Sequence, residues 1–97
     1  MRQAARTDEN QTEVVDALRG AGCCVAITSQ LGKGFPDLVV RVNTHAPIGV
    51  HRVLLMEIKN GAKPLTSDEQ RFCDEWNHPS YVVVRSVDEA LRAVGIL

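Results

Sequence analysis

Two acidic residues and one lysine stand at the ends of strand-like segments, where charged side chains need a physical reason. Asp37 opens an apolar run over residues 38–40, and Glu57 and Lys59 end the run that starts near residue 52. Because side chains alternate between the faces of a strand, Glu57 and Lys59 project from the same face. Burying such charges without a partner costs several kcal/mol. A divalent metal ion between Asp37 and Glu57, with Lys59 beside it, would supply a partner.

The length and composition indicate one small globular domain over residues 1–97. Of the 97 residues, 44% are hydrophobic and 24% are charged, which is ordinary for a globular protein and sufficient for one core. The net charge of -1 argues against a protein that coats nucleic acid by bulk electrostatic attraction. A nuclease is still allowed, because an acidic metal site would offset basic residues elsewhere.

The cysteines and the apolar segments bear on where the protein acts. Cys23, Cys24 and Cys73 lack any CxxC or Cys/His zinc spacing, so we expect reduced thiols, with Cys23 and Cys24 on a buried strand. No apolar stretch approaches the roughly 18 residues that a membrane span needs, and the first residues lack a signal-peptide core. We therefore expect a soluble cytoplasmic protein with no membrane partner.

Hydrophobic periodicity and turn signals predict an α/β fold with the element order α-β-β-β-α-β-α. In chain order, the predicted elements cover residues 8–19, 23–28, 37–42, 52–59, 66–76, 81–84 and 86–94. Pro36 marks the start of the second strand, because proline cannot donate to a ladder. A turn over residues 43–49 predicts an antiparallel hairpin. Residues 66–69 form a capping box that begins the second helix, in which we expect Phe72 and Trp76 to be core residues.

This element order and three motifs resemble the PD-(D/E)xK nuclease superfamily, whose motif is matched by Pro36-Asp37 followed by Glu57-Ile58-Lys59. More narrowly, the chain is similar to small phage and bacterial nucleases of the VRR-NUC type, which are related to archaeal Holliday-junction resolvases. Their pattern G-x-P-D-L, E-x-K and L-[ST]-x-x-Q is met by residues 34–38, by 57–59 and, slightly stretched, by 65–70. The resemblance implies a restriction-endonuclease-like α-β-β-β-α-β-α core with a central mixed sheet flanked by helices.

The resemblance also implies roles for individual residues in a metal-dependent DNA endonuclease. Asp37 and Glu57 would ligate Mg²⁺ or Mn²⁺, with the carbonyl of Ile58 as a further ligand. Lys59 would orient or help deprotonate the attacking water and stabilise charge in the transition state. Gln70 would support the metal shell or its water. Oxygen ligands suit these hard cations, which acidify bound water and polarise phosphate.

The match weakens in the first helix, where resolvase-like relatives place a glutamate that reaches the metal. In this chain Gln11 falls near that position, and Asp8 is the acid closest to the same helix face. A neutral amide is a poorer ligand than a carboxylate. We expect a contribution from Asp8 or Gln11.

By resemblance, we expect the substrate to be structured DNA (a junction, a flap or a nicked duplex). We also expect a homodimer that presents two sites and acts in a bacterial or phage-infected host cell. Lys33, Arg41, Lys63 and Arg85 are candidates for phosphate contacts, although a solvated surface role fits them too.

Other interpretations of the same residues stay open. Asp37 could be an ordinary turn residue after a proline, and Glu57 and Lys59 could form an exposed cross-strand pair. Gln70 could be an ordinary exposed residue at a helix start. At the level of function, the rivals are a degenerate nuclease fold that binds DNA or a protein, and a nuclease that acts on RNA.

Overall fold

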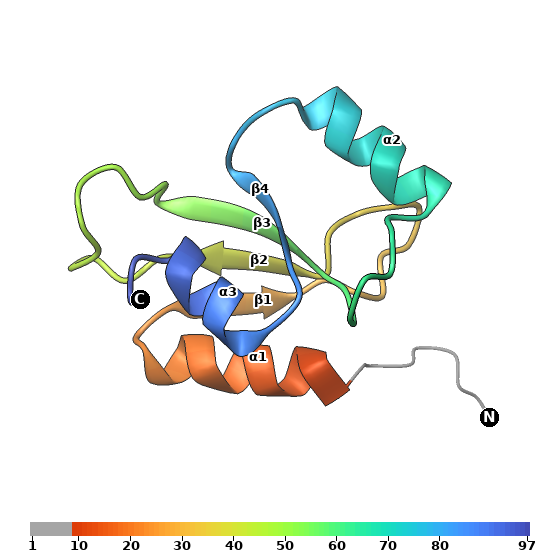
Figure 1. The fold of residues 1–97 in the computed structure, drawn as a ribbon. Helices are drawn as coiled ribbons and strands as arrows, with labels where there is room; N and C mark the ends of the chain where they lie inside the picture. Colours follow the sequence, from red (N-terminus) through yellow and green to blue (C-terminus); the bar gives the residue numbers. More distant parts are fainter. Residues whose placement is uncertain (1–8) are drawn as a thin grey trace.

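The computed structural model describes residues 9–97 and shows an α/β fold with a four-stranded mixed sheet and three helices (Figure 1). In chain order the elements are α1 (Glu9–Gly20), β1 (Cys24–Ile27), β2 (Leu38–Arg41), β3 (Val53–Ile58), α2 (Ser67–Trp76), β4 (Tyr81–Val84) and α3 (Val87–Ala93). Each overlaps a range predicted from the hydrophobic pattern, and the predicted helix start at Asp8 lies outside the described residues. Within residues 9–97, no helix is long and apolar enough to cross a membrane.

The strands lie in the order β1-β2-β3-β4, which makes β2 and β3 the central strands. β2 pairs antiparallel with both β1 and β3, whereas β3 pairs parallel with β4. The pairing of β2 with β3 confirms the hairpin predicted from the turn over residues 43–49. α2 forms the crossover between the parallel strands β3 and β4, which no tight turn could join.

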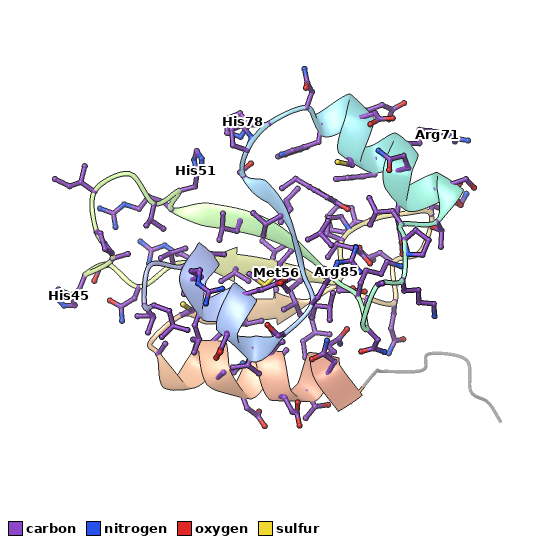
Figure 2. The ribbon with its side chains drawn as sticks, viewed as in Figure 1. His45, His51, Met56, Arg71, His78 and Arg85 are labelled. Atoms are coloured by element: carbon purple, nitrogen blue, oxygen red, sulfur yellow. The ribbon has the colours of Figure 1, made fainter. Side chains whose placement is uncertain are left out.

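One face of the sheet carries the hydrophobic core. Leu54, Met56 and Ile58 of β3 point to this face, as their alternation predicts, and Leu38 and Val40 of β2 lie opposite them in the register. α1 and α3 cover this face with the buried side chains Val14, Val15, Leu18, Ala90 and Val94. The side chain of Met56, labelled in Figure 2, is fully buried. The core thus anchors β3 firmly up to the residue that precedes Lys59.

The opposite face carries Asp37, Glu57 and Lys59, and α2 packs over it through aromatic rings. The ring centroid of Phe72 in α2 lies 5.4 Å from that of Phe35 and 5.9 Å from that of Tyr81. No residue of α2 is fully buried. The charged face is therefore covered by a helix that is held less extensively than α1.

Two positions that were predicted to be buried are exposed. Trp76 is 46% exposed, because one side of its ring packs on Phe72 and its Nε1 donates to Ser80 Oγ at 3.0 Å while the rest faces solvent. Cys24 is exposed because it points to the opposite face of the edge strand from the core residue Cys23. The sequence-based expectation was therefore wrong for Trp76 and Cys24 and correct for Cys23.

The loop before β2 approaches the start of α2 so closely that only glycine fits at residue 34. A Cβ at Gly34 would lie 2.2 Å from the carbonyl oxygen of Asp68, whereas a Cβ at Gly32 would meet nothing within 4 Å. Both glycines have positive φ, +83° and +73°, so an L side chain costs about 1–2 kcal/mol at either position.

We expect Gly34→Ala to lower the free energy of unfolding by about 2 kcal/mol more than Gly32→Ala in urea titrations. Equal losses would contradict the close approach.

Candidate functional site

Pro36 interrupts the ladder between β2 and β3 at the start of β2. The β2–β3 register, continued beyond β2, places Pro36 opposite Ile58. Hydrogen-bonded and non-hydrogen-bonded pairs alternate along this ladder, and the pair Val42–Arg52 is of the same kind as Pro36–Ile58. Val42 and Arg52 are hydrogen bonded, with the Val42 amide 2.8 Å from the Arg52 carbonyl. A regular ladder would therefore exchange two hydrogen bonds at Ile58. Because proline has no N–H, it offers no donor to the Ile58 carbonyl.

The side chain of Asp37 replaces the main chain at this interruption. Its Oδ2 accepts a hydrogen bond from the amide of Ile58 at 2.8 Å. On the other side, the amide of Thr28 donates to the Asp37 carbonyl and its hydroxyl donates to the Pro36 carbonyl, both at 2.7 Å. Asp37 is thus fixed by contacts to the strand on each side, and its carboxylate is directed at β3 rather than at its own turn.

Glu57 lies opposite Asp37 in the continued register and on the same face of the sheet. It is only 2% exposed, and its Oε1 has no hydrogen-bond partner among the described residues. Burial raises the pKa of Glu57 to about 9, with the negative charges of Asp37 and Glu69 adding to the shift. Burial also raises the pKa of Asp37, against the hydrogen bond from Ile58. Without a cation, this acid pair retains a proton at neutral pH.

The surroundings of the acid pair are poorly solvated. The hydroxyl of Tyr81 is buried on the same face and has no hydrogen-bond partner in residues 9–97. Burial, followed by the charge of Glu57, raises the pKa of Tyr81. A buried polar atom without a partner calls for an explanation, and binding of a water molecule or an ion would supply one for both atoms.

The donor set fits a hard divalent cation. It would consist of the carboxylates of Asp37 and Glu57 and the carbonyl of Ile58, all oxygen ligands of the kind that Mg²⁺ and Mn²⁺ take. The free Oε1 of Glu57 provides the structural argument, since a cation would satisfy it. Within residues 9–97, no three side chains of His, Cys, Asp or Glu are grouped as a metal site. A main-chain oxygen is thus an essential part of the proposed set.

Lys59 is held beside the acid pair by contacts from three other elements. Its amide donates to the Val84 carbonyl of β4 at 3.0 Å, and its carbonyl accepts from Asn10 Nδ2 of α1 at 3.3 Å. Its Nζ lies 2.6 Å from Glu69 Oε1 of α2. Because Glu57 and Lys59 are both more than nine-tenths buried, the interpretation as an exposed cross-strand pair is wrong.

Glu69 belongs to the site, although the sequence analysis assigned it only to the capping box. It occupies the third position of α2, where its side chain accepts from the amide of Thr66 at 2.8 Å. Burial opposes its ionisation, but hydrogen bonds from Lys59 and Thr66 outweigh burial and lower the pKa of Glu69. A signal was available in the sequence: without any stretching, the last position of L-[ST]-x-x-Q falls on Glu69 and not on Gln70.

The structure does not bring the other predicted supporting residues to the acid pair. Gln70 is exposed and its Nε2 donates to Asp74 Oδ1, one helical turn away, at 2.9 Å. Gln11 is buried in α1, with its Nε2 3.3 Å from Ser29 Oγ. Asp8 lies outside the described residues. In α1, the side chain that does contact the site is Asn10, through the carbonyl of Lys59.

Only some of the basic candidates lie at the end of the sheet that carries the acid pair. Lys33 and Lys63 are exposed in the loops at the end of the sheet where β2 begins and β3 ends. Arg41 is exposed at the other end of β2. The guanidinium of Arg85, labelled in Figure 2, donates to the carbonyls of Gly61 and Lys63 at 2.8 and 2.7 Å and so orders the loop that follows Lys59.

The histidines lie away from the acid pair. Figure 2 shows His45 at the tip of the loop that precedes β3 and His51 near His78 at the end of the sheet where β3 begins. The ring centroids of His51 and His78 are 5.4 Å apart, and all three residues are exposed.

Comparison with known proteins does not assign this site. No family model matches the chain, and no curated protein and no solved structure shows significant similarity to it. The case for the site therefore depends on its own geometry.

The raised pKa of Glu57 predicts how stability depends on pH in the metal-free protein. Between the ordinary glutamate range and about pH 9, the folded state holds a proton that the unfolded state has lost, so stability falls as pH rises. We expect Glu57→Gln, measured by urea unfolding in EDTA, to gain about 1–3 kcal/mol relative to wild type between about pH 5 and pH 8.5. The exposed-site control Glu75→Gln should follow wild type. Parallel curves for Glu57→Gln and wild type would contradict the buried, protonated glutamate.

Proposed function

We propose that this protein is a metal-dependent DNA endonuclease with a restriction-endonuclease-like core, which hydrolyses phosphodiester bonds in structured DNA such as junctions, flaps or nicked duplexes. The observation that carries the proposal is an acid pair, the buried Glu57 and the half-buried Asp37, with the ammonium of Lys59 anchored beside it on one face of the sheet. Burying these charges without a compensating cation costs several kcal/mol, a cost that isolated charges on the surface would not incur.

The positions of the motif residues in the fold support the same class of enzyme. Pro36-Asp37 directly precedes the second strand and Glu57-Ile58-Lys59 spans the end of the third, within the order α-β-β-β-α-β-α. Antiparallel pairing of these two strands brings the start of one to the end of the other. This is the arrangement that the resemblance implies for a PD-(D/E)xK nuclease of the VRR-NUC type.

The proposed chemistry assigns a separate task to each group. Asp37, Glu57 and the Ile58 carbonyl would hold Mg²⁺ or Mn²⁺, and Glu57 would first give up its proton. Bound there, the metal would acidify a water molecule and polarise the scissile phosphate. Lys59, as a buried ammonium, would orient the attacking water and stabilise the negative charge that develops on the phosphate.

The substrate would be held from the end of the sheet at which the acid pair lies. Lys33 and Lys63 are exposed in the two loops there and are suited to phosphate contacts, while Arg41 would meet DNA farther along the same face. These contacts would act locally, because the whole chain has a net charge of only -1.

We further propose that the active species is a homodimer acting in the cytoplasm. One domain of 97 residues offers little surface for a branched duplex, and two sites would suit two strands. We expect sedimentation equilibrium at micromolar concentration to give twice the mass of the chain. A monomer that cleaves junctions at full rate would contradict this part of the proposal.

A second candidate is a degenerate nuclease fold that binds DNA or a protein without cleaving. Its support is that Lys59 is already paired with Glu69 and that Gln70 bonds to Asp74. In addition, Gln11 stands near the position where resolvase-like relatives place a glutamate. A nuclease directed at RNA is the remaining rival, and matched RNA and DNA substrates separate it from the DNA enzyme.

Cleavage of supercoiled plasmid and of a four-way junction, with Mg²⁺, Mn²⁺ or EDTA, tests the proposal. We expect Asp37→Asn and Lys59→Ala to lower the cleavage rate by at least about 100-fold, because each removes a charge from the reacting centre. Asparagine can still accept the hydrogen bond from Ile58, so the fold is preserved. Arg92→Ala, an exposed basic residue of α3, should cleave like wild type.

The outcomes separate the candidates. Cleavage that needs metal and both residues would establish the site, and preference for an RNA version of the junction would reassign the substrate. Folded wild type that binds DNA but does not cleave it with Mn²⁺ would overturn the enzyme and favour the binding module.

A further inference from the structure

We propose that Glu69 is a positioning residue that fixes the ammonium of Lys59 beside the Asp37–Glu57 pair. The proposal rests on the proposed function and adds a residue to it. Its basis is the 2.6 Å contact between Lys59 Nζ and Glu69 Oε1, formed between side chains that are 9% and 18% exposed.

A lysine needs such a partner if its charge is to act at one point. The side chain has four rotatable bonds, and ordering it costs about 1.5–2 kcal/mol of conformational entropy. The bonds to Val84 and Asn10 fix only the main chain of Lys59. In the described part of the chain, Glu69 is the one carboxylate within ion-pair distance of its ammonium.

Glu69 is itself fixed, because the start of α2 holds it. The same Oε1 that meets Lys59 accepts the amide of Thr66 at 2.8 Å, and the hydroxyl of Thr66 accepts the amide of Glu69 at 3.2 Å. The close approach of Gly34 to the Asp68 carbonyl fixes this first turn against the loop that leads to Asp37. The carboxylate of Glu69 is thus placed by main-chain contacts rather than by a flexible surface side chain.

A purely structural role is the main alternative, since Glu69 also caps α2. Loss of a cap costs about 1 kcal/mol of stability and would affect activity only through folding. The two roles are separable, because Thr66→Ala breaks the same capping box while Glu69 and its contact with Lys59 stay in place. Glu69→Gln keeps an oxygen that can accept from both Lys59 and Thr66, and glutamine is also accepted at this capping position.

The experiment compares Glu69→Ala, Glu69→Gln and Thr66→Ala with wild type in Mn²⁺-dependent cleavage of the preferred DNA substrate. We expect Glu69→Ala to lower kcat by about 10–100-fold with KM within about twofold, because the lysine acts in the transition state and not in substrate binding. Thr66→Ala should keep kcat within about twofold, and Glu69→Gln should restore most of the rate lost in Glu69→Ala. Urea unfolding should show similar destabilisation for Thr66→Ala and Glu69→Ala.

A readout independent of cleavage keeps the proposal testable if wild type proves inactive. A buried, paired ammonium exchanges its protons slowly, so Lys59 should give an Nζ–H signal in NMR spectra, assigned by its absence in Lys59→Ala. We expect the signal to persist in Thr66→Ala and to disappear in Glu69→Ala. Equal kcat values for Glu69→Ala and Thr66→Ala, or a Lys59 signal unchanged in Glu69→Ala, would overturn the positioning role. Inactive wild type with the expected signals would instead overturn only the proposed nuclease.

Discussion

The candidate site depends on one defect in the sheet, the proline that stands opposite Ile58. At this position a regular antiparallel ladder would satisfy both the amide and the carbonyl of Ile58. Proline has no amide to donate to the Ile58 carbonyl, and the Ile58 amide donates instead to the carboxylate of Asp37. The proposed metal-binding set, one side chain from each strand and one main-chain oxygen, would follow directly from the proline that precedes β2. Replacing Pro36 would alter the site without touching a proposed ligand.

Because the site is largely buried, excess negative charge there destabilises the folded protein. Three carboxyl groups, those of Asp37, Glu57 and Glu69, lie near one ammonium on a face shielded from water. The fold responds in two ways: Glu57 keeps a proton, and Glu69 is stabilised in its ionised form by Lys59 and the first turn of α2. A divalent cation would allow Glu57 to ionise. The electrostatics that penalise two ionised carboxylates in this site would also favour binding of the proposed cation.

Local periodicity was sufficient to predict the elements, the hairpin and the common face of Glu57 and Lys59, because these depend on residues close in sequence. The partner of Lys59 was not predicted, since the contact joins residues ten apart through the geometry of a loop and a helix start. The stretched motif pointed to Gln70, whose amide is instead satisfied within its own helix by Asp74. Exposure of Trp76 also escaped prediction, because an amphipathic pattern shows which side of a helix is apolar but not whether a surface covers it.

The two faces of the sheet are stabilised differently, and this asymmetry bears on function. α1 and α3 bury a continuous aliphatic core on one face, whereas α2 has no fully buried residue and rests on the other face through Phe72, the glycine approach at residue 34 and the Lys59–Glu69 pair. Two of these three attachments lie at the amino-terminal end of the helix, next to the acid pair. The helix is thus best fixed where it places Glu69, while its far end, with Trp76, is more exposed. Ordering at the site follows from where α2 is attached, and not from how much surface α2 buries.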